Sequence, residues 1–176
     1  MTHAPAIDAF LVEIEGRHDI DLEVSPLVRR YLGVVRAYLI RLHRELGSGR
    51  VVNEANSDLM DRLLRRLFVL VEERWSMAGH AVEGGLCVVA GGGYARREMS
   101  IHSDVDLLVL YREQLSPYVV RIAERLQYWL WDAGLTVGCA TRTIAETVKL
   151  GREDVTVRTG VLTARFLCGD GEFFHD

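Results

Sequence analysis

The chain has 176 residues, of which 49% are apolar and 26% charged, and its formal charge at pH 7 is −4. This length suits one compact domain, or one domain with a helical extension. The acidic balance argues against a nucleic-acid binder that depends on bulk positive charge. No apolar run approaches the about 20 residues of a membrane-spanning helix, and the first residues lack a signal-peptide pattern. We therefore expect a cytoplasmic globular protein with neither a membrane nor a nucleic acid as its partner.

Missing motifs and the cysteine pattern exclude further kinds of chemistry. The sequence contains neither a P-loop nor a zincin motif. Its only lysine is Lys149, so we expect arginine side chains or backbone amides to bind any phosphate. Cys87, Cys139 and Cys168 are odd in number and widely spaced, which favours reduced, packed thiols over a disulfide framework or a metal site.

The charge reverses within the first 50 residues. Residues 1–24 carry six acidic side chains against one arginine, a net charge of −5, and residues 25–50 carry six arginines against one glutamate, a net charge of +5. These arginines are Arg29, Arg30, Arg36, Arg41, Arg44 and Arg50. They form either a binding patch for an acidic partner or a solvated helix face complemented by the acidic start of the chain, and the sequence favours the solvated face.

Two amphipathic helices are predicted before residue 80. Ser25 can cap the first, Pro26 suits its first turn, and Gly47 suits its end. The second is expected from about residue 57 to 77, after a loop that opens at Gly47. Because a short loop joins them, we expect an antiparallel helical pair in an N-terminal helical region, residues 1–80, followed by a core domain, residues 81–176.

The core domain alternates strands and helices. Apolar runs predict strands over residues 86–90, 104–111 and 135–143. A long amphipathic helix is expected from Ser116 to Gly134. A short helix from about residue 144 and a final helix over residues 154–167 complete the prediction.

The segment between the first two strands carries the chemistry. Gly92 and Gly93 follow the first strand, ten residues intervene, and Asp104 and Asp106 open the second. Residues two apart on a strand share a face, so the two carboxylates lie within roughly 7 Å of each other. Like charges at that distance favour a divalent cation between them, and Mg²⁺ prefers one or two carboxylates plus phosphate oxygens. We therefore predict Asp104 and Asp106 as catalytic, Mg²⁺-binding residues.

The glycine turn predicts a phosphate-binding element beside the metal. Without a β-carbon, Gly92 and Gly93 let backbone N–H groups approach an anion closely. Arg96 and Arg97 follow and are candidates to bind phosphate, the alternative being a surface ion pair with Glu98. Ser103 is a further nucleotide-binding candidate, the alternative being a hydroxyl that caps the turn.

The spacing of Gly-Gly, ten residues and Asp-x-Asp resembles the nucleotidyltransferase superfamily related to DNA polymerase β. The sequences of residues 92–99 and 102–107 are similar to those of the bifunctional PII uridylyltransferase/uridylyl-removing enzymes, and residues 130–138, 142–143, 154–157 and 164–170 add to the resemblance. The resemblance covers about residues 80–176. It implies an α+β fold of the polymerase-β-like nucleotidyltransferase kind, a small mixed sheet flanked by helices after the helical pair.

The resemblance also implies a reaction. Uridine monophosphate would pass from UTP to a tyrosine hydroxyl of a PII-type signal protein, a role in nitrogen regulation, with Mg²⁺ as the cofactor. One departure matters: the superfamily's third metal-associated carboxylate is expected on the third strand, and residues 135–143 contain no acid, Thr136 included. A non-catalytic nucleotide- or protein-binding module, or an enzyme with a small-molecule or RNA acceptor, are therefore the alternatives.

Overall fold

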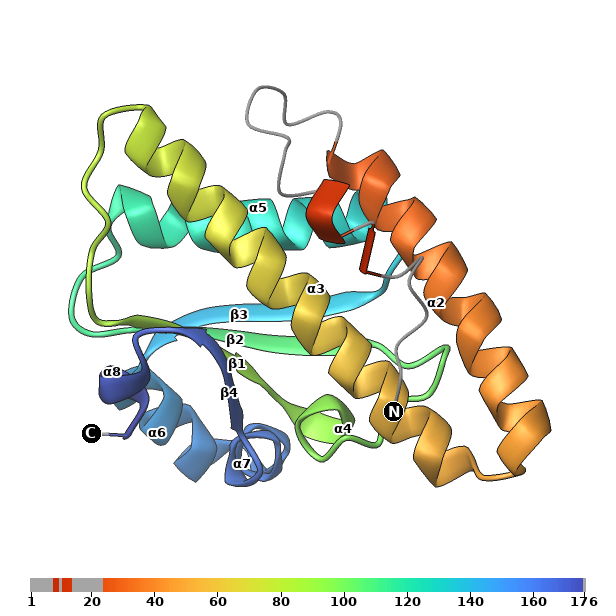
Figure 1. The fold of residues 1–176 in the computed structure, drawn as a ribbon. Coiled ribbons are helices and arrows are strands. Elements are labelled where there is room, and N and C mark those ends of the chain that lie inside the picture. The colour runs from red at the N-terminus through yellow and green to blue at the C-terminus, as the bar shows by residue number, and fades with distance from the viewer. Residues whose placement is uncertain (1–7, 10, 14–23, 176) are drawn as a thin grey trace.

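Four strands form one mixed sheet at the centre of the molecule (Figure 1). The structure is a computed structural model that describes residues 8–9, 11–13 and 24–175. The strands are β1 (Leu86–Ala90), β2 (Val105–Tyr111), β3 (Val137–Thr143) and β4 (Arg165–Gly169), in the order β3-β2-β1-β4. β1 pairs antiparallel with β2 and β4, and β2 pairs parallel with β3.

The predicted N-terminal helical pair is confirmed as α2 (Val24–Leu46) and α3 (Gly49–Met77). The helices pack against each other, and the Tyr31 hydroxyl of α2 donates a buried hydrogen bond of 2.7 Å to the Leu59 carbonyl of α3. α3 begins eight residues earlier than expected. The reason is Ser48, whose side chain caps the helix by accepting from the Val51 amide.

The third long helix, α5 (Pro117–Asp132), has the ends that its sequence predicts. Ser116 accepts a hydrogen bond from the Val119 amide, and Pro117 occupies the first turn, where a missing N–H costs nothing. Gly134 follows the helix with a φ of +94°, a conformation that glycine adopts without strain.

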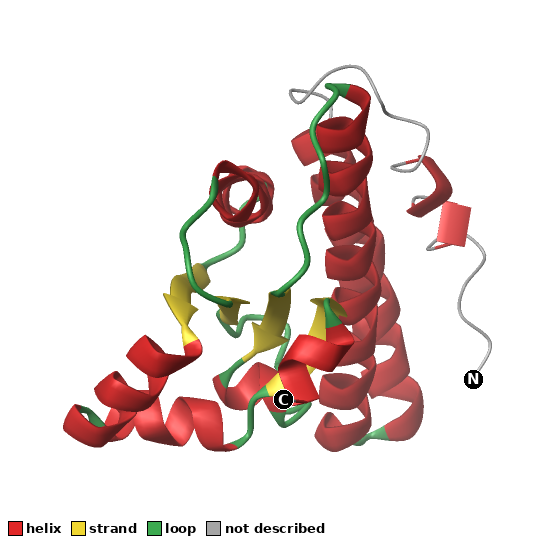
Figure 2. Cartoon of the chain, turned by 90° about the vertical axis from the view of Figure 1, so that its left-hand side faces the viewer, coloured by secondary structure: helices red, strands yellow, loops and turns green. Residues whose placement is uncertain are grey.

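The sheet lies between two helical layers (Figure 2). On one face, α2, α3 and α5 contribute to a large apolar core together with alternate strand residues such as Val88, Val105 and Val109. On the other face, Cys87, Val89 and Phe173 form a smaller cluster with partly buried neighbours. That second side carries α6 (Ile144–Glu153), α7 (Val155–Leu162) and α8 (Gly171–His175), and the short α4 (Gly92–Ala95) follows β1.

The larger core is continuous across residue 80. Leu63, Leu64 and Leu67 of α3 are fully buried in the same cluster as Val88 of β1 and Leu126 of α5. The division into a helical region of residues 1–80 and a core of residues 81–176 stays a prediction. The fold as a whole is α+β, with a four-stranded mixed sheet flanked by helices, as expected.

The expected final helix over residues 154–167 is wrong. α7 ends at Leu162, and residues 165–169 form β4, an edge strand beside β1. Pairing with the free edge of β1 stabilises this segment more than a further helical turn would. Its last residue, Gly169, has a φ of +96°, and a β-carbon there would lie 2.5 Å from the Leu86 carbonyl oxygen.

The acidic start and the arginine-rich helix meet at one described ion pair. Arg30 of α2 lies 3.5 Å from Glu13, which supports the solvated-face interpretation for that arginine. The other acidic residues of the start, except Asp8, lie outside the described residues. In the described part of the chain, none of the helices has the length and apolar character needed to cross a membrane.

Candidate functional site

A cavity of about 370 Å³ opens where the end of β1 meets α4, β2, β3 and α7. Gly91, Gly92 and Arg96 form its wall at the glycine turn, and Asp106 lies on β2. The remaining polar lining comes from Arg142, Thr156 and Thr159. The cavity therefore combines a turn of backbone amides, a carboxylate and two arginines.

The Asp106 carboxylate lies between two glycines. A β-carbon added to Gly92 of α4 would lie 2.7 Å from Asp106 Oδ2, and one added to Gly138 of β3 would lie 2.9 Å from Oδ1. Both separations are too short for any real β-carbon. Gly92 also has a φ of +52°, so a side chain there would be strained as well as crowded. The two glycines thus leave room for a carboxylate at this end of the sheet.

Register and alternation explain why Asp106 reaches the cavity. Val105 and Leu107 point into the large core, so Asp106 points to the opposite face, where it stays exposed beside the Gly138 backbone. Its carbonyl accepts a 2.9 Å hydrogen bond from the Gly91 amide, which fixes the strand against the turn. Asp104 comes one residue before β2 and is exposed.

The two carboxylates are the metal-ligand candidates. Within the described residues, no group of three or more His, Cys, Asp or Glu side chains lies together as a metal site. The β3 residues on the face of Asp106 are Gly138, Ala140 and Arg142, so no third acid faces it from that strand. Two exposed carboxylates with oxygen donors still suit one Mg²⁺ that completes its shell with water and phosphate oxygens.

A buried network of hydrogen bonds holds the glycine turn against α3 and β4. The Asp61 carboxylate of α3 is 4% exposed and pairs with Arg165 of β4, with an Nη1–Oδ2 distance of 2.6 Å. Tyr94 of α4 donates its hydroxyl to Asp61 Oδ1 at 2.7 Å, and Arg165 Nε donates to the Ala95 carbonyl at 3.1 Å. The network therefore joins α3, α4 and β4.

Electrostatics keep two members of this network, Tyr94 and Arg165, protonated. Burial and the neighbouring Asp61 charge raise the pKa of Tyr94 well above its usual range, so the phenol remains a hydrogen-bond donor. Burial opposes the charge of Arg165, but the hydrogen bond and the charge of Asp61 raise its pKa overall. The glycine turn is consequently held by a phenol and a guanidinium that both keep their protons.

The other predicted nucleotide-binding residues separate into two groups. Arg96 lines the cavity and pairs with Glu98 at 2.8 Å, and Gly93 lies next to Gly92 in the first turn of α4. Arg97 instead forms an ion pair of 2.5 Å with Asp58 of α3. Ser103 caps its own turn, accepting from the Ser100 amide at 3.0 Å. Arg97 and Ser103 are outside the lining of this cavity.

Sequence reasoning missed Gly138, Asp61 and Arg165 as parts of the site. A glycine inside a strand marks a close approach, and that signal was available for Gly138. Nothing local marks Asp61 or Arg165, which are 104 residues apart and meet only in the fold. Arg142, on the third strand, is far along the chain from the Gly-Gly and Asp-x-Asp motif, so the sequence did not place it in the same site.

The three cysteines do not provide a nucleophile. All three are free, and burial raises the pKa of Cys87 to about 12 and that of Cys139 to about 11. Burial also raises the pKa of Cys168. Because the thiolate is the reactive form, these thiols are inert at neutral pH, in agreement with the packed role expected for them.

A mixed sheet with a glycine turn after β1 and aspartates at the start of β2 defines a protein of the nucleotidyltransferase class. Comparison with known families agrees. The chain belongs to the family described as putative nucleotidyltransferase DUF294, whose model matches residues 34–155.

Curated relatives share one description, bifunctional uridylyltransferase/uridylyl-removing enzyme. The protein of Rhodospirillum rubrum is 42% identical over 131 residues, which are 74% of this chain and 14% of the relative. Those of Nitrobacter hamburgensis and Nitrobacter winogradskyi are 35% and 36% identical over 173 residues, 97% of this chain and 18% and 19% of the relatives. The chain therefore spans less than a fifth of the length of these relatives.

Proposed function

We propose that this chain transfers a nucleoside monophosphate from a nucleoside triphosphate to an acceptor hydroxyl at the cavity of Asp106. One observation carries the proposal: the Asp106 carboxylate lies in the space that Gly92 and Gly138 leave free, directly beside the glycine turn. The similarity to uridylyltransferases supports UTP as the donor.

Asp104 and Asp106 would hold one Mg²⁺. When bound, the ion would neutralise charge on the transferred phosphoryl group. The two aspartates fit this role because both are exposed carboxylates. In addition, the close approach of the Gly92 and Gly138 backbones restricts where the oxygens of Asp106 can lie.

The backbone amides at the start of α4 and the cavity arginines would hold the phosphates. The first N–H groups of a helix have no acceptor within the helix, and Gly92 and Gly93 carry two of them. Arg96 and Arg142 both line the cavity and can each donate two hydrogen bonds to phosphate oxygens. Arg97 and Ser103 stay predictions from the sequence for this role.

The reaction would be an in-line displacement. The acceptor oxygen forms a bond to the α-phosphorus, the bond from that phosphorus to the bridging oxygen breaks, and pyrophosphate leaves with its electron pair. The proton of the acceptor hydroxyl passes to solvent or to a carboxylate of the site. By resemblance the acceptor is a tyrosine hydroxyl of a PII-type signal protein.

A thermal-shift titration with the four ribonucleoside triphosphates, with and without Mg²⁺, tests the site. A ligand at 100 times its dissociation constant adds roughly 2.7 kcal/mol, which for a chain of this size corresponds to a rise in Tm of about 5 °C or more. We expect a Mg²⁺-dependent rise, largest with UTP. Asp104→Asn and Asp106→Asn should abolish it, whereas Asp58→Asn, an exposed carboxylate on α3, should retain it.

A nucleotide-binding module without catalysis is the second candidate. The observation that favours it is the row Gly138, Ala140 and Arg142, which places no acid opposite Asp106 on β3. Pyrophosphate release with UTP, Mg²⁺ and a PII-type protein separates the two: release that Asp106→Asn abolishes identifies the enzyme. A thermal shift without release at any Mg²⁺ concentration would identify the module.

A further inference from the structure

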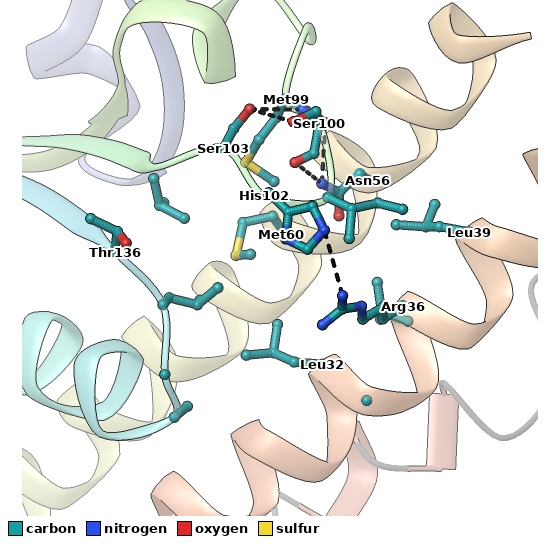
Figure 3. Close-up of a pocket in the computed structure, with 17 residues that line it drawn as sticks. Leu32, Arg36, Leu39, Asn56, Met60, Met99, Ser100, His102, Ser103 and Thr136 are labelled. Carbon is teal, nitrogen blue, oxygen red and sulfur yellow. Dashed lines mark hydrogen bonds between the residues drawn. The ribbon is translucent and has the colours of Figure 1, made fainter.

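A second cavity, of about 330 Å³, lies beside the loop that precedes β2 (Figure 3). Its walls come from α2, α3, the loop of residues 99–103 and the turn between α5 and β3. None of its lining residues belongs to the cavity of Asp106. It is therefore a separate site, and its argument does not rest on the proposed function.

The rim of this second cavity is cationic. Arg36 projects from α2 toward His102 of the loop, with Nη2 and Nε2 3.5 Å apart (Figure 3). The described residues that line the cavity include no aspartate or glutamate. Because a guanidinium only donates, His102 Nε2 accepts this hydrogen bond, and the remaining N–H groups of Arg36 can donate to an acidic ligand group with no lining carboxylate in competition.

The loop offers fixed hydroxyl groups beside Arg36. The Ser100 and Ser103 hydroxyl oxygens are 2.9 Å apart, and Ser103 Oγ also accepts from the Ser100 amide. The two hydroxyl groups carry two protons, and the hydrogen bond between them uses one. The other proton can be donated to a ligand. The buried Asn56 holds the loop in place by donating to the Met99 and Ser100 carbonyls at 3.1 and 3.0 Å.

The inner part of the cavity is apolar. Leu32, Ile101 and Leu135 line it and are partly buried, so part of their apolar surface is open to a ligand. Since the volume is at the lower end of the roughly 300–1,000 Å³ that ligand cavities span, the guest is small.

We propose that this cavity is a binding site for a small amphipathic carboxylate, whose acidic group contacts Arg36 and whose apolar body lies against Leu32 and Ile101. Inorganic phosphate would satisfy the rim and leave the apolar floor unused. An uncharged molecule of the same shape would fill the floor and leave the rim unsatisfied. The site requires both parts of the ligand.

The test is a titration of the full chain with 3-phenylpropionate, followed by isothermal calorimetry and by saturation-transfer NMR of the ligand. The matched probes are 3-phenylpropanamide, which lacks the charge, and inorganic phosphate, which lacks the apolar body. We expect 3-phenylpropionate to bind about tenfold or more tightly than either, because a charge-assisted hydrogen bond and the apolar contact each contribute.

Three variants locate the binding. Arg36→Gln should weaken it about tenfold, whereas Arg44→Gln, an exposed arginine on the same helix and outside the cavity, should leave it unchanged. Gly33→Leu should block the cavity: Gly33 lines it, and an added β-carbon meets no atom within 4 Å. Replacing a helical glycine also favours the helix, so this variant should fold.

Two results would show that the ligand does not bind in this cavity. One is the absence of 3-phenylpropionate binding at millimolar concentration to a chain that still unfolds cooperatively. The other is binding that survives both Arg36→Gln and Gly33→Leu, which would place the ligand elsewhere. Equal affinity for phosphate and 3-phenylpropionate would likewise contradict the amphipathic ligand and leave a simple anion site.

Discussion

Gly138 shows how one absent β-carbon can position a carboxylate. An alanine at this position would place its β-carbon 2.9 Å from Asp106 Oδ1, and the aspartate side chain is the part free to move. We therefore expect Gly138→Ala to change the free energy of unfolding little, by about 1 kcal/mol or less. The same substitution should move the carboxylate and remove the Mg²⁺-dependent nucleotide shift in Tm.

Gly160→Ala is the matched control for this prediction. Gly160 lines the same cavity from α7, but a β-carbon there meets no atom within 4 Å. It should keep the nucleotide shift. If Gly138→Ala also keeps it, the carboxylate position does not depend on the missing β-carbon, and the crowding described for Asp106 has no functional consequence.

Asp61 is the residue on which the support of the glycine turn depends. Replacing it by alanine would leave the partly buried Arg165 and the Tyr94 hydroxyl without their acceptor. Removing one partner of such a pair costs about 3 kcal/mol or more. Urea unfolding should show this loss for Asp61→Ala and less than about 1 kcal/mol for Asp58→Ala, whose ion pair is exposed. Similar losses in both variants would contradict the special role of Asp61.

Residues close in sequence made part of the site predictable. Gly92 and Asp106 could be assigned together because the ends of adjacent antiparallel strands meet, and the structure places the two in contact. Gly138, Asp61 and Arg165 reach the same place through sheet pairing and helix packing. Contacts of this kind leave no local pattern, so a single sequence does not reveal them.

Capping residues made both ends of α5 predictable, and the failure at β4 follows from what caps cannot describe. Ser116, Pro117 and Gly134 bound α5 as expected. After α7, the segment of residues 165–169 pairs with β1 although its spacing resembles a helix. One signal was present: Gly169 at the end of the strand.

The cap of α7 should make the stability of this helix depend on pH. The backbone amides of Thr156 and Val157 donate to the Asp154 carboxylate and lower its pKa below the ordinary value. A carboxylate with a lowered folded-state pKa stabilises the fold above its unfolded pKa of about 3.9 and loses this contribution as the pH falls through the folded value.

Asp154→Asn tests this dependence, because asparagine also caps a helix and does not titrate. Between about pH 5 and pH 2.5, the free energy of unfolding of the wild type should fall more steeply than that of the variant. Urea unfolding monitored by circular dichroism at a series of pH values measures both slopes. Parallel slopes would show that the cap contributes nothing to the acid sensitivity.

At the scale of the whole molecule, α3 links its partner helix α2 to the sheet. Its buried face contacts α2 at one end and β4 at the other, and its fully buried leucines share one cluster with β1 and α5. A core that is continuous in this way favours a single cooperative unit. The sequence, by contrast, suggested a boundary at residue 80, because the residue composition changes there. The packing of the core shows no corresponding break.

Equilibrium unfolding decides between these two views. Trp75 on α3 lies before the suggested boundary, and the buried Trp129 on α5 lies after it, so tryptophan fluorescence reports on both sides. We expect fluorescence and far-ultraviolet circular dichroism to give one urea midpoint with the same slope, and Trp75→Phe and Trp129→Phe proteins to unfold with coincident curves in the two signals. Separate midpoints, with the Trp75 signal changing first, would instead establish residues 81–176 as an independent domain.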